Sequence, residues 1–265
     1  MVRALFVLLF PVFAFASNCD SLFDERHDGR DKSVEALSCY EANQGAARKD
    51  KAHALSRISY LKFYIAEFFT EKKSNLLLEA ISHAEKGMLL FGTKYDVAAY
   101  SKLPADEKSV VAELLYNYGL TTSRYIDLAG PLEAIRRMED IKKSMNSIIR
   151  MKEESVSFFG AHRTLGIFHM KVPAIAGGDI KLSEQYLVKA VNSTIAYGSM
   201  SAYPSNNLYL AELYLKLNQD QKACGMLSQI SALTDNDIVK LANGHILESR
   251  QSVKKAAELM EKKCR

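Results

Sequence analysis

Aromatic side chains lie beside a cation on two segments of the sequence, and this combination suits the binding of an amphipathic acid. The apolar part of such a ligand would pack on the rings, and a guanidinium would bind its carboxylate through two parallel hydrogen bonds. The candidate binding residues are Tyr116, Tyr118, Arg124, His162, Arg163 and Phe168. We expect Arg163 to face an internal cleft between helices. The alternative is that the rings belong to the core and the arginines are solvated or cap helix carbonyls.

The sequence lacks the spacings on which familiar catalytic and metal sites depend. The six histidines are scattered, without an HExxH pattern or a pair of ligands four residues apart. Neither a GxSxG nucleophile motif nor a CxxC motif is present. We therefore expect no catalytic residue, no metal and no cofactor. An unrecognised hydrolase is the remaining enzymatic alternative.

The composition is that of an ordinary globular protein, with 48% hydrophobic and 25% charged residues. The formal net charge of +4 is mild, and basic residues alternate with acidic ones at helical spacing, as in Glu133 and Arg137. This distribution indicates solvated helix faces and gives no reason to expect a nucleic-acid partner.

The N-terminus has the pattern of a cleavable signal peptide over residues 1–16. Arg3 is followed by an apolar run that is too short to cross a membrane, and Ala14-Phe15-Ala16 forms a small-x-small cleavage site. A lipid anchor at Cys19 is disfavoured, because Asn18 stands where a lipoprotein signal would have a small residue. We expect an exported, periplasmic protein without a transmembrane segment in its mature form.

The four cysteines are Cys19, Cys39, Cys224 and Cys264, and an even number in an exported protein suggests disulfides. Four cysteines allow three pairings, and the sequence does not select one. Proximity in the chain favours Cys19 with Cys39 and Cys224 with Cys264. Buried free thiols are the alternative if the chain stays in a reducing compartment.

Apolar residues recur at intervals of three and four along most of the chain, which predicts an all-α fold. We expect one helical domain over residues 32–265, after a flexible segment over residues 17–31. Gly244 is a potential break in the last predicted helix. The predicted helices are Lys32–Arg48, Asp50–Thr70, Lys73–Phe91, Tyr95–Tyr100, Pro104–Ala129, Leu132–Lys152, Ser155–Met170, Asp179–Tyr197, Ser205–Leu217, Gln219–Ala232 and Asp235–Lys263.

Two helix pairs have the spacing of tetratricopeptide repeats. Leu165-Gly166 and Phe168 precede the loop Lys171–Asp179, and Leu210-Ala211 and Tyr214 begin a second match. In this pattern a small residue allows the partner helix to approach closely. The spacing predicts an array of antiparallel helix pairs that forms a superhelix. A generic helical bundle is the alternative.

The same residues carry a resemblance to a known family. The order His162-Arg163-x-Leu165-Gly166, Pro173 and Gly177-Gly178-Asp179, followed by a helix rich in Leu and Ala, resembles the TatT-like family. These are exported tetratricopeptide-like proteins associated with tripartite ATP-independent periplasmic (TRAP) transporters. Leu114–Ala129 resembles the aromatic-rich helix of that family, with Tyr in place of its tryptophan, and Leu208–Ile230 resembles its last clear repeat.

The resemblance implies a helical periplasmic scaffold with an apolar cleft or tunnel and a solute-binding protein as its partner. We therefore expect a non-enzymatic protein that docks a periplasmic partner and holds an apolar or amphipathic small molecule. The alternative from a different class is a structural or assembly adaptor of the cell envelope without a small-molecule site.

Overall fold

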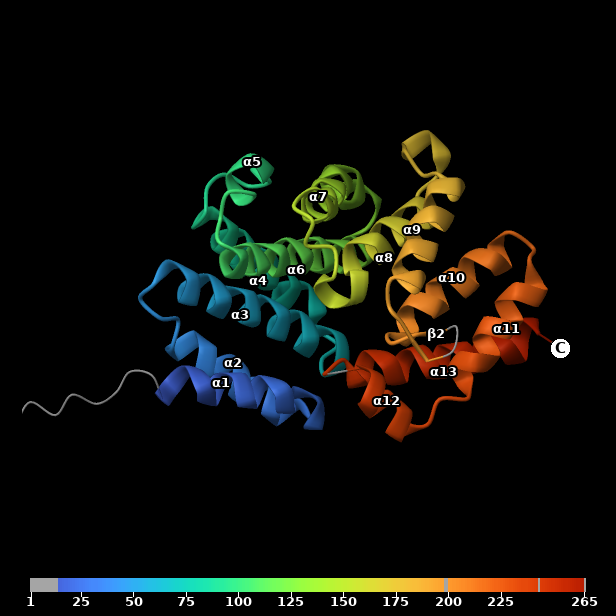
Figure 1. Ribbon diagram of the computed structural model, residues 1–265, viewed down its shortest axis with the longest axis horizontal. Coiled ribbons are helices and arrows are strands. Elements are labelled where there is room, and N and C mark those ends of the chain that lie inside the picture. The colour runs from blue at the N-terminus through green and yellow to red at the C-terminus, as the bar shows by residue number, and fades with distance from the viewer. Residues whose placement is uncertain (1–13, 198–199, 243, 265) are drawn as a thin grey trace, which may run out of the picture.

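The computed structural model describes residues 14–197, 200–242 and 244–264, and most of them are helical (Figure 1). The predicted all-α class is therefore confirmed, although two short strands form an antiparallel ribbon. The elements of the first half are α1 (Ala14–Asp24), η1 (Glu25–Asp28), α2 (Arg30–Ala42), α3 (Arg48–Phe68), α4 (Lys73–Leu89), α5 (Val97–Tyr100), α6 (Ala105–Ala129) and α7 (Pro131–Arg150). Those of the second half are α8 (Val156–Lys171), η2 (Ala174–Ala176), α9 (Ile180–Asn192), β1 (Ile195–Tyr197), β2 (Met200–Ser201), α10 (Pro204–Lys216), α11 (Asp220–Ser231), α12 (Asp235–Ala242) and α13 (Ile246–Lys263).

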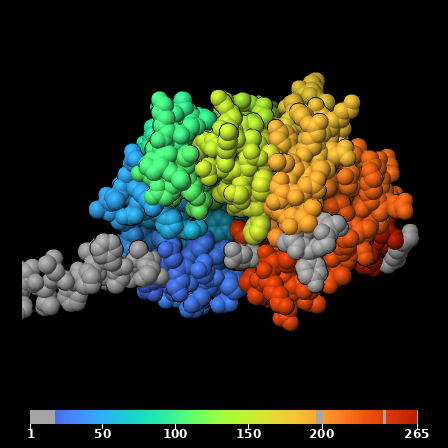
Figure 2. All heavy atoms as spheres, in the orientation of Figure 1, coloured from blue at the N-terminus to red at the C-terminus, as the bar shows by residue number. Residues whose placement is uncertain are grey.

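Most helices pack against helices that are close to them in the chain. α3 packs on α4, α6 on α7, α8 on α9, and α10 on α11. The chain thereby crosses the molecule from α1–α4 to α10 and α11, and α12 and α13 then return toward α3 (Figure 1). On the surface, the blue N-terminal elements and the red C-terminal elements lie next to one another along the lower edge (Figure 2).

The contact between α8 and α9 depends on a glycine and a helix cap. A Cβ at Gly166 would lie 2.5 Å from the side chain of Leu187, so only glycine permits this approach. The carboxylate of Asp179 accepts hydrogen bonds from the backbone N–H groups of Lys181 at 2.8 Å and Leu182 at 3.1 Å, which caps α9. Gly177 has a φ of 91°, a conformation that favours glycine.

The flexible segment expected over residues 17–31 is instead ordered as α1 and η1. Cys19, Phe23 and Arg26 are buried there, although the segment has only a short apolar pattern. Its order depends on distant contacts that a local pattern cannot indicate, among them the Cys19–Cys39 disulfide. The predicted signal peptide lies mostly outside the described residues. None of the described helices has the length and apolarity needed to cross a membrane.

Two disulfides join the cysteines that are near each other in the chain. Cys19 pairs with Cys39 across a Cα–Cα distance of 5.5 Å, and Cys224 pairs with Cys264 across 5.6 Å. The first disulfide ties α1 to α2. The second ties α11 to the end of α13.

The predicted helix boundaries differ from the structure at several places. The last segment is broken at Gly244, whose φ is 83°, and α13 begins at Ile246. The helix expected to run to Tyr197 ends at Asn192, where β1 follows. The continuous right-handed helix expected from Ser155 is wrong at its start, because residues 157–159 have positive φ.

Candidate functional site

A cavity of about 720 Å³ lies between α3, α6, α7, α8, α10 and α13. Its walls consist mainly of apolar and aromatic side chains, and charged groups such as Glu67, Glu248 and Lys255 line it as well. The apolar wall includes Phe63, Leu120, Met138, Ile141, Ile167 and Leu208. A cavity of this size and composition suits a small apolar or amphipathic molecule. We call it the large cavity.

Arg163 of α8 is buried in the wall of the large cavity. Its Nη2 donates a hydrogen bond to the hydroxyl of Tyr116 at 2.7 Å, and its Nη1 donates to Oδ1 of Asn206 at 2.7 Å. The guanidinium carbon lies 4.6 Å from the ring centre of Tyr203. These partners are all neutral. Within the described residues, no carboxylate lies within ion-pair distance of Arg163.

Arg163 also binds an unusual turn at the start of α8. Ser157, Phe158 and Phe159 have φ values of 49°, 55° and 57°, which is the left-handed region. Nη1 of Arg163 donates to the carbonyls of Ser157 at 3.2 Å and Phe158 at 3.4 Å. A left-handed residue other than glycine costs roughly 1–2 kcal/mol, so contacts from outside the turn must compensate.

The large cavity contains three more of the sequence-predicted residues. Tyr116, Arg124 and Phe168 all line it. Arg124 is neutralised, because its Nε and Nη2 donate to the two carboxylate oxygens of Glu67, each at 2.7 Å. Arg163 is therefore the cation of the predicted set that is left without a carboxylate partner.

Two of the predicted residues do not line the large cavity. The hydroxyl of Tyr118 accepts a hydrogen bond from Lys94 at 2.8 Å and donates to Asp140 at 3.1 Å, on another side of α6. Nε2 of His162 lies 2.6 Å from a carboxylate oxygen of Glu154. Tyr116 and Tyr118 are two residues apart, which places their side chains about 200° apart around a helix axis, so they face different surroundings.

A hydrogen-bonded group that the sequence analysis missed lies where the large cavity meets α13. The hydroxyl of Tyr60 donates to Oε1 of Glu248 at 2.5 Å and lies 3.3 Å from Nδ1 of His245. Burial opposes ionisation of Glu248, but hydrogen bonds from His245 and Tyr60 and the charge of His245 outweigh it and lower the pKa of this carboxyl. The aromatic positions of α3 were a signal for Tyr60, but nothing local indicated its partners on α13.

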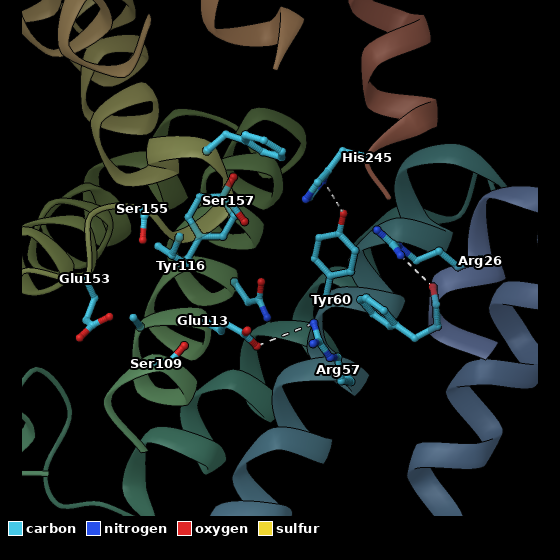
Figure 3. A pocket seen from close by; sticks show the side chains of 15 residues that line it. Arg26, Arg57, Tyr60, Ser109, Glu113, Tyr116, Glu153, Ser155, Ser157 and His245 are labelled. Atoms are coloured by element: carbon cyan, nitrogen blue, oxygen red, sulfur yellow. Dashed lines mark hydrogen bonds and ion pairs between the residues drawn. The ribbon is translucent and has the colours of Figure 1, made fainter. Parts of the chain in front are cut away.

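A second, smaller pocket of about 330 Å³ lies beside this group (Figure 3). Its lining is mostly polar and includes Arg57 and Glu113, whose charged groups are 3.8 Å apart. Tyr60, Tyr116 and His245 line both cavities. Figure 3 shows Tyr116 on one side of the small pocket, and Tyr60 and His245 on the other. We call it the polar pocket.

The described residues contain no group of three or more His, Cys, Asp or Glu side chains arranged to hold a metal ion. No family model matches the chain. Over 94 residues, or 33% of its length, the chain is 36% identical to an aspartate–tRNA(Asp/Asn) ligase of Bacillus subtilis (strain 168). The chain spans only 15% of the length of that relative. A match this short does not show the family of the chain.

Proposed function

We propose that this chain is a non-enzymatic helical scaffold that holds an amphipathic acid in the large cavity, with the acid group at Arg163. The observation that carries the proposal is the buried guanidinium of Arg163, whose described partners are all neutral. A buried charge without a counter-charge is unfavourable, and a ligand carboxylate would supply that charge. A carboxylate also matches the shape of a guanidinium, because its two oxygens can accept two parallel N–H hydrogen bonds.

The walls of the large cavity support an apolar tail on this ligand. Side chains such as Phe63, Met138 and Ile167 surround the space, and its volume of about 720 Å³ is within the range of small-molecule sites. The apolar tail would be buried against these side chains, which contributes about 0.8 kcal/mol for each CH₂ group.

The proposal includes a tetratricopeptide-like array in the periplasm. Gly166 and Ala211 lie at buried contacts of the pairs α8–α9 and α10–α11, as that repeat pattern requires. The two disulfides favour an oxidising compartment, which agrees with export through the proposed signal peptide over residues 1–16.

We further propose that the scaffold docks a protein partner, for which the family resemblance implies a TRAP-type solute-binding protein. Exposed apolar side chains beside the large cavity support such a surface. Ile135 lines the cavity and is 67% exposed, Leu132 is 74% exposed, and Ile175 is fully exposed. Apolar side chains gathered at one place on a surface are typical of interaction sites.

Calorimetric titration with decanoate and decanol tests the ligand proposal. Decanoate should bind about tenfold or more tightly than decanol, because only the acid makes charged hydrogen bonds with Arg163. Arg163→Gln should remove this preference. Lys171→Gln is the matched control and should retain it, because Lys171 is half exposed at the cavity rim and lies 3.7 Å from Asp127.

Two results would contradict the ligand proposal. One is equal affinity of the wild-type protein for decanoate and decanol, which needs no variant and therefore does not depend on how Arg163→Gln folds. The other is an unchanged preference in Arg163→Gln. If neither compound binds, the adaptor without a small-molecule site becomes the better account.

Co-purification with a purified TRAP-type solute-binding protein tests the partner proposal. The double variant Leu132→Asp/Ile135→Asp should lose the complex, because it places charges on the exposed apolar surface. Val239→Asp is the control, since Val239 is also exposed, at 55%, but lies on α12. Binding that survives the double variant, or is lost equally in the control, argues against this surface.

A further inference from the structure

The left-handed turn Ser157–Phe159 is an unfavourable conformation for the residues that form it. None of the three is glycine, and each has a positive φ. The cost of the left-handed region corresponds to a population factor of roughly 5 to 30 for each such residue. The residues that follow, from Gly160 to Lys171, form a regular right-handed helix. The turn would extend α8 if it changed to the right-handed conformation.

Side chains from outside the turn hold it in place. Arg163 donates to the carbonyls of Ser157 and Phe158 at 3.2 and 3.4 Å. Asn206 of α10 donates to the carbonyl of Phe158 at 3.1 Å and accepts a hydrogen bond from Arg163. The ring of Phe158 stacks on Tyr203, with 5.3 Å between the ring centres. Arg163 thus takes part in most of the polar contacts that hold the turn.

The turn and its guanidinium lie between the two cavities. Arg163 lines the large cavity, while Ser157 and Phe158 line the polar pocket. A carboxylate that binds Arg163 would compete with the carbonyls of Ser157 and Phe158 for the same N–H donors. When these donors are lost, their hydrogen bonds no longer offset the energetic cost of the left-handed backbone.

We propose that binding of a carboxylate at Arg163 releases the turn Ser157–Phe159, which changes to the right-handed conformation and reshapes the polar pocket. The proposal rests on the ligand site proposed above and describes its regulation. The turn is then a two-state element that reports occupancy of the large cavity at the polar pocket. Ligand binding and turn release are thermodynamically linked, so a change that favours the left-handed turn lowers the affinity for the ligand.

Ser157→Gly and Ser157→Ala form a matched pair that tests this linkage. Both remove the hydroxyl, which makes no hydrogen bond among the described residues, but only glycine relieves the left-handed backbone. Decanoate should bind Ser157→Gly about fivefold more weakly than Ser157→Ala, because the unliganded turn is stabilised. Equal affinity of the two variants for decanoate would overturn the proposal.

The sign of φ gives a direct test. Backbone NMR couplings of protein labelled at Ser and Phe distinguish positive from negative φ. Saturation with decanoate should change φ of residues 157–159 from positive to negative, and decanol should leave it positive. If decanoate binds and φ stays positive, the switch is wrong and the ligand site stands. If decanoate does not bind, the proposed ligand site and the proposed switch are both wrong.

The sign of φ at residues 157–159 in Arg163→Gln without ligand gives a test that needs no ligand probe. Loss of the guanidinium should give negative φ at residues 157–159, as decanoate does in the wild-type protein. Positive φ in Arg163→Gln would show that Arg163 does not hold the turn and would overturn the proposal.

Discussion

Arg163 of α8 and Tyr116 of α6 are joined by a hydrogen bond of 2.7 Å from Nη2 to the phenolic oxygen. Tyr116 lines both cavities, so this bond fixes the cation of the large cavity to the wall of the polar pocket. The position of the guanidinium is therefore set by α6 as well as by its own helix.

Tyr116→Phe should destabilise the protein by about 1–3 kcal/mol, because a buried N–H of Arg163 loses its acceptor. Tyr125→Phe is the control. The Tyr125 ring packs under Arg137, and its hydroxyl makes no hydrogen bond among the described residues. The free energy of unfolding in urea measures both variants. Equal losses would mean that the bond to Arg163 contributes nothing.

Gly166→Ala and Gly225→Ala should change stability in opposite directions. A Cβ at Gly166 meets the Leu187 side chain at 2.5 Å, so alanine overpacks the α8–α9 contact and costs about 1–3 kcal/mol. A Cβ at Gly225 in α11 meets nothing within 4 Å, so alanine there should stabilise the helix by about 0.5–1 kcal/mol. Thermal unfolding compares the two. A Gly166→Ala variant as stable as the wild-type protein is incompatible with the close contact described.

Removal of each disulfide should destabilise the chain by an amount that depends on the loop it closes. Cys224 and Cys264 are 40 residues apart, and replacement of both by Ser should cost about 4 kcal/mol in the chain-entropy model. Cys19 and Cys39 are 20 residues apart, and the same change should cost about 3 kcal/mol. Mass measurement of the native protein, with and without reductant, first establishes that both bonds are present. Free thiols in the native protein would contradict the pairing.

The buried carboxylate of Glu248 should make stability depend on acidity. The pKa of this carboxyl is lowered in the folded protein. Its contribution to the free energy of unfolding is therefore fully present above its pKa in the unfolded chain, near 4.3, and is lost as pH falls through its pKa in the folded protein. Wild-type protein should lose more stability than Glu248→Gln below about pH 4. Urea unfolding at a series of pH values measures this difference. Parallel pH profiles would show that the folded and unfolded pKa values of Glu248 are equal.

The sequence predicted the helices because their apolar residues recur at three and four, as in α3 and α6. It did not predict the left-handed turn at Ser157–Phe159, since its hydrogen bonds come partly from Asn206, 48 residues from Phe158. Local preferences alone favour a right-handed start to α8.

The candidate site could be predicted only in part for a similar reason. Arg163 lines the large cavity, but the sequence did not indicate which arginine has a carboxylate partner. Glu67 neutralises Arg124 from α3, 57 residues away. Tyr118 shared the aromatic character of Tyr116, and only its place around the helix axis separates their surroundings. His245 and Glu248 reach the cavity because α13 returns to α3.

The contacts between α3 and α13 have a consequence for how the protein unfolds. Tyr60 binds Glu248, and Arg26 of η1 donates a hydrogen bond to the carbonyl of Gly244. An open series of stacked helices can lose its ends one unit at a time, because each unit contacts only its neighbours. Here η1 and α3 contact the start of α13, so melting that begins at either of these regions would expose the other.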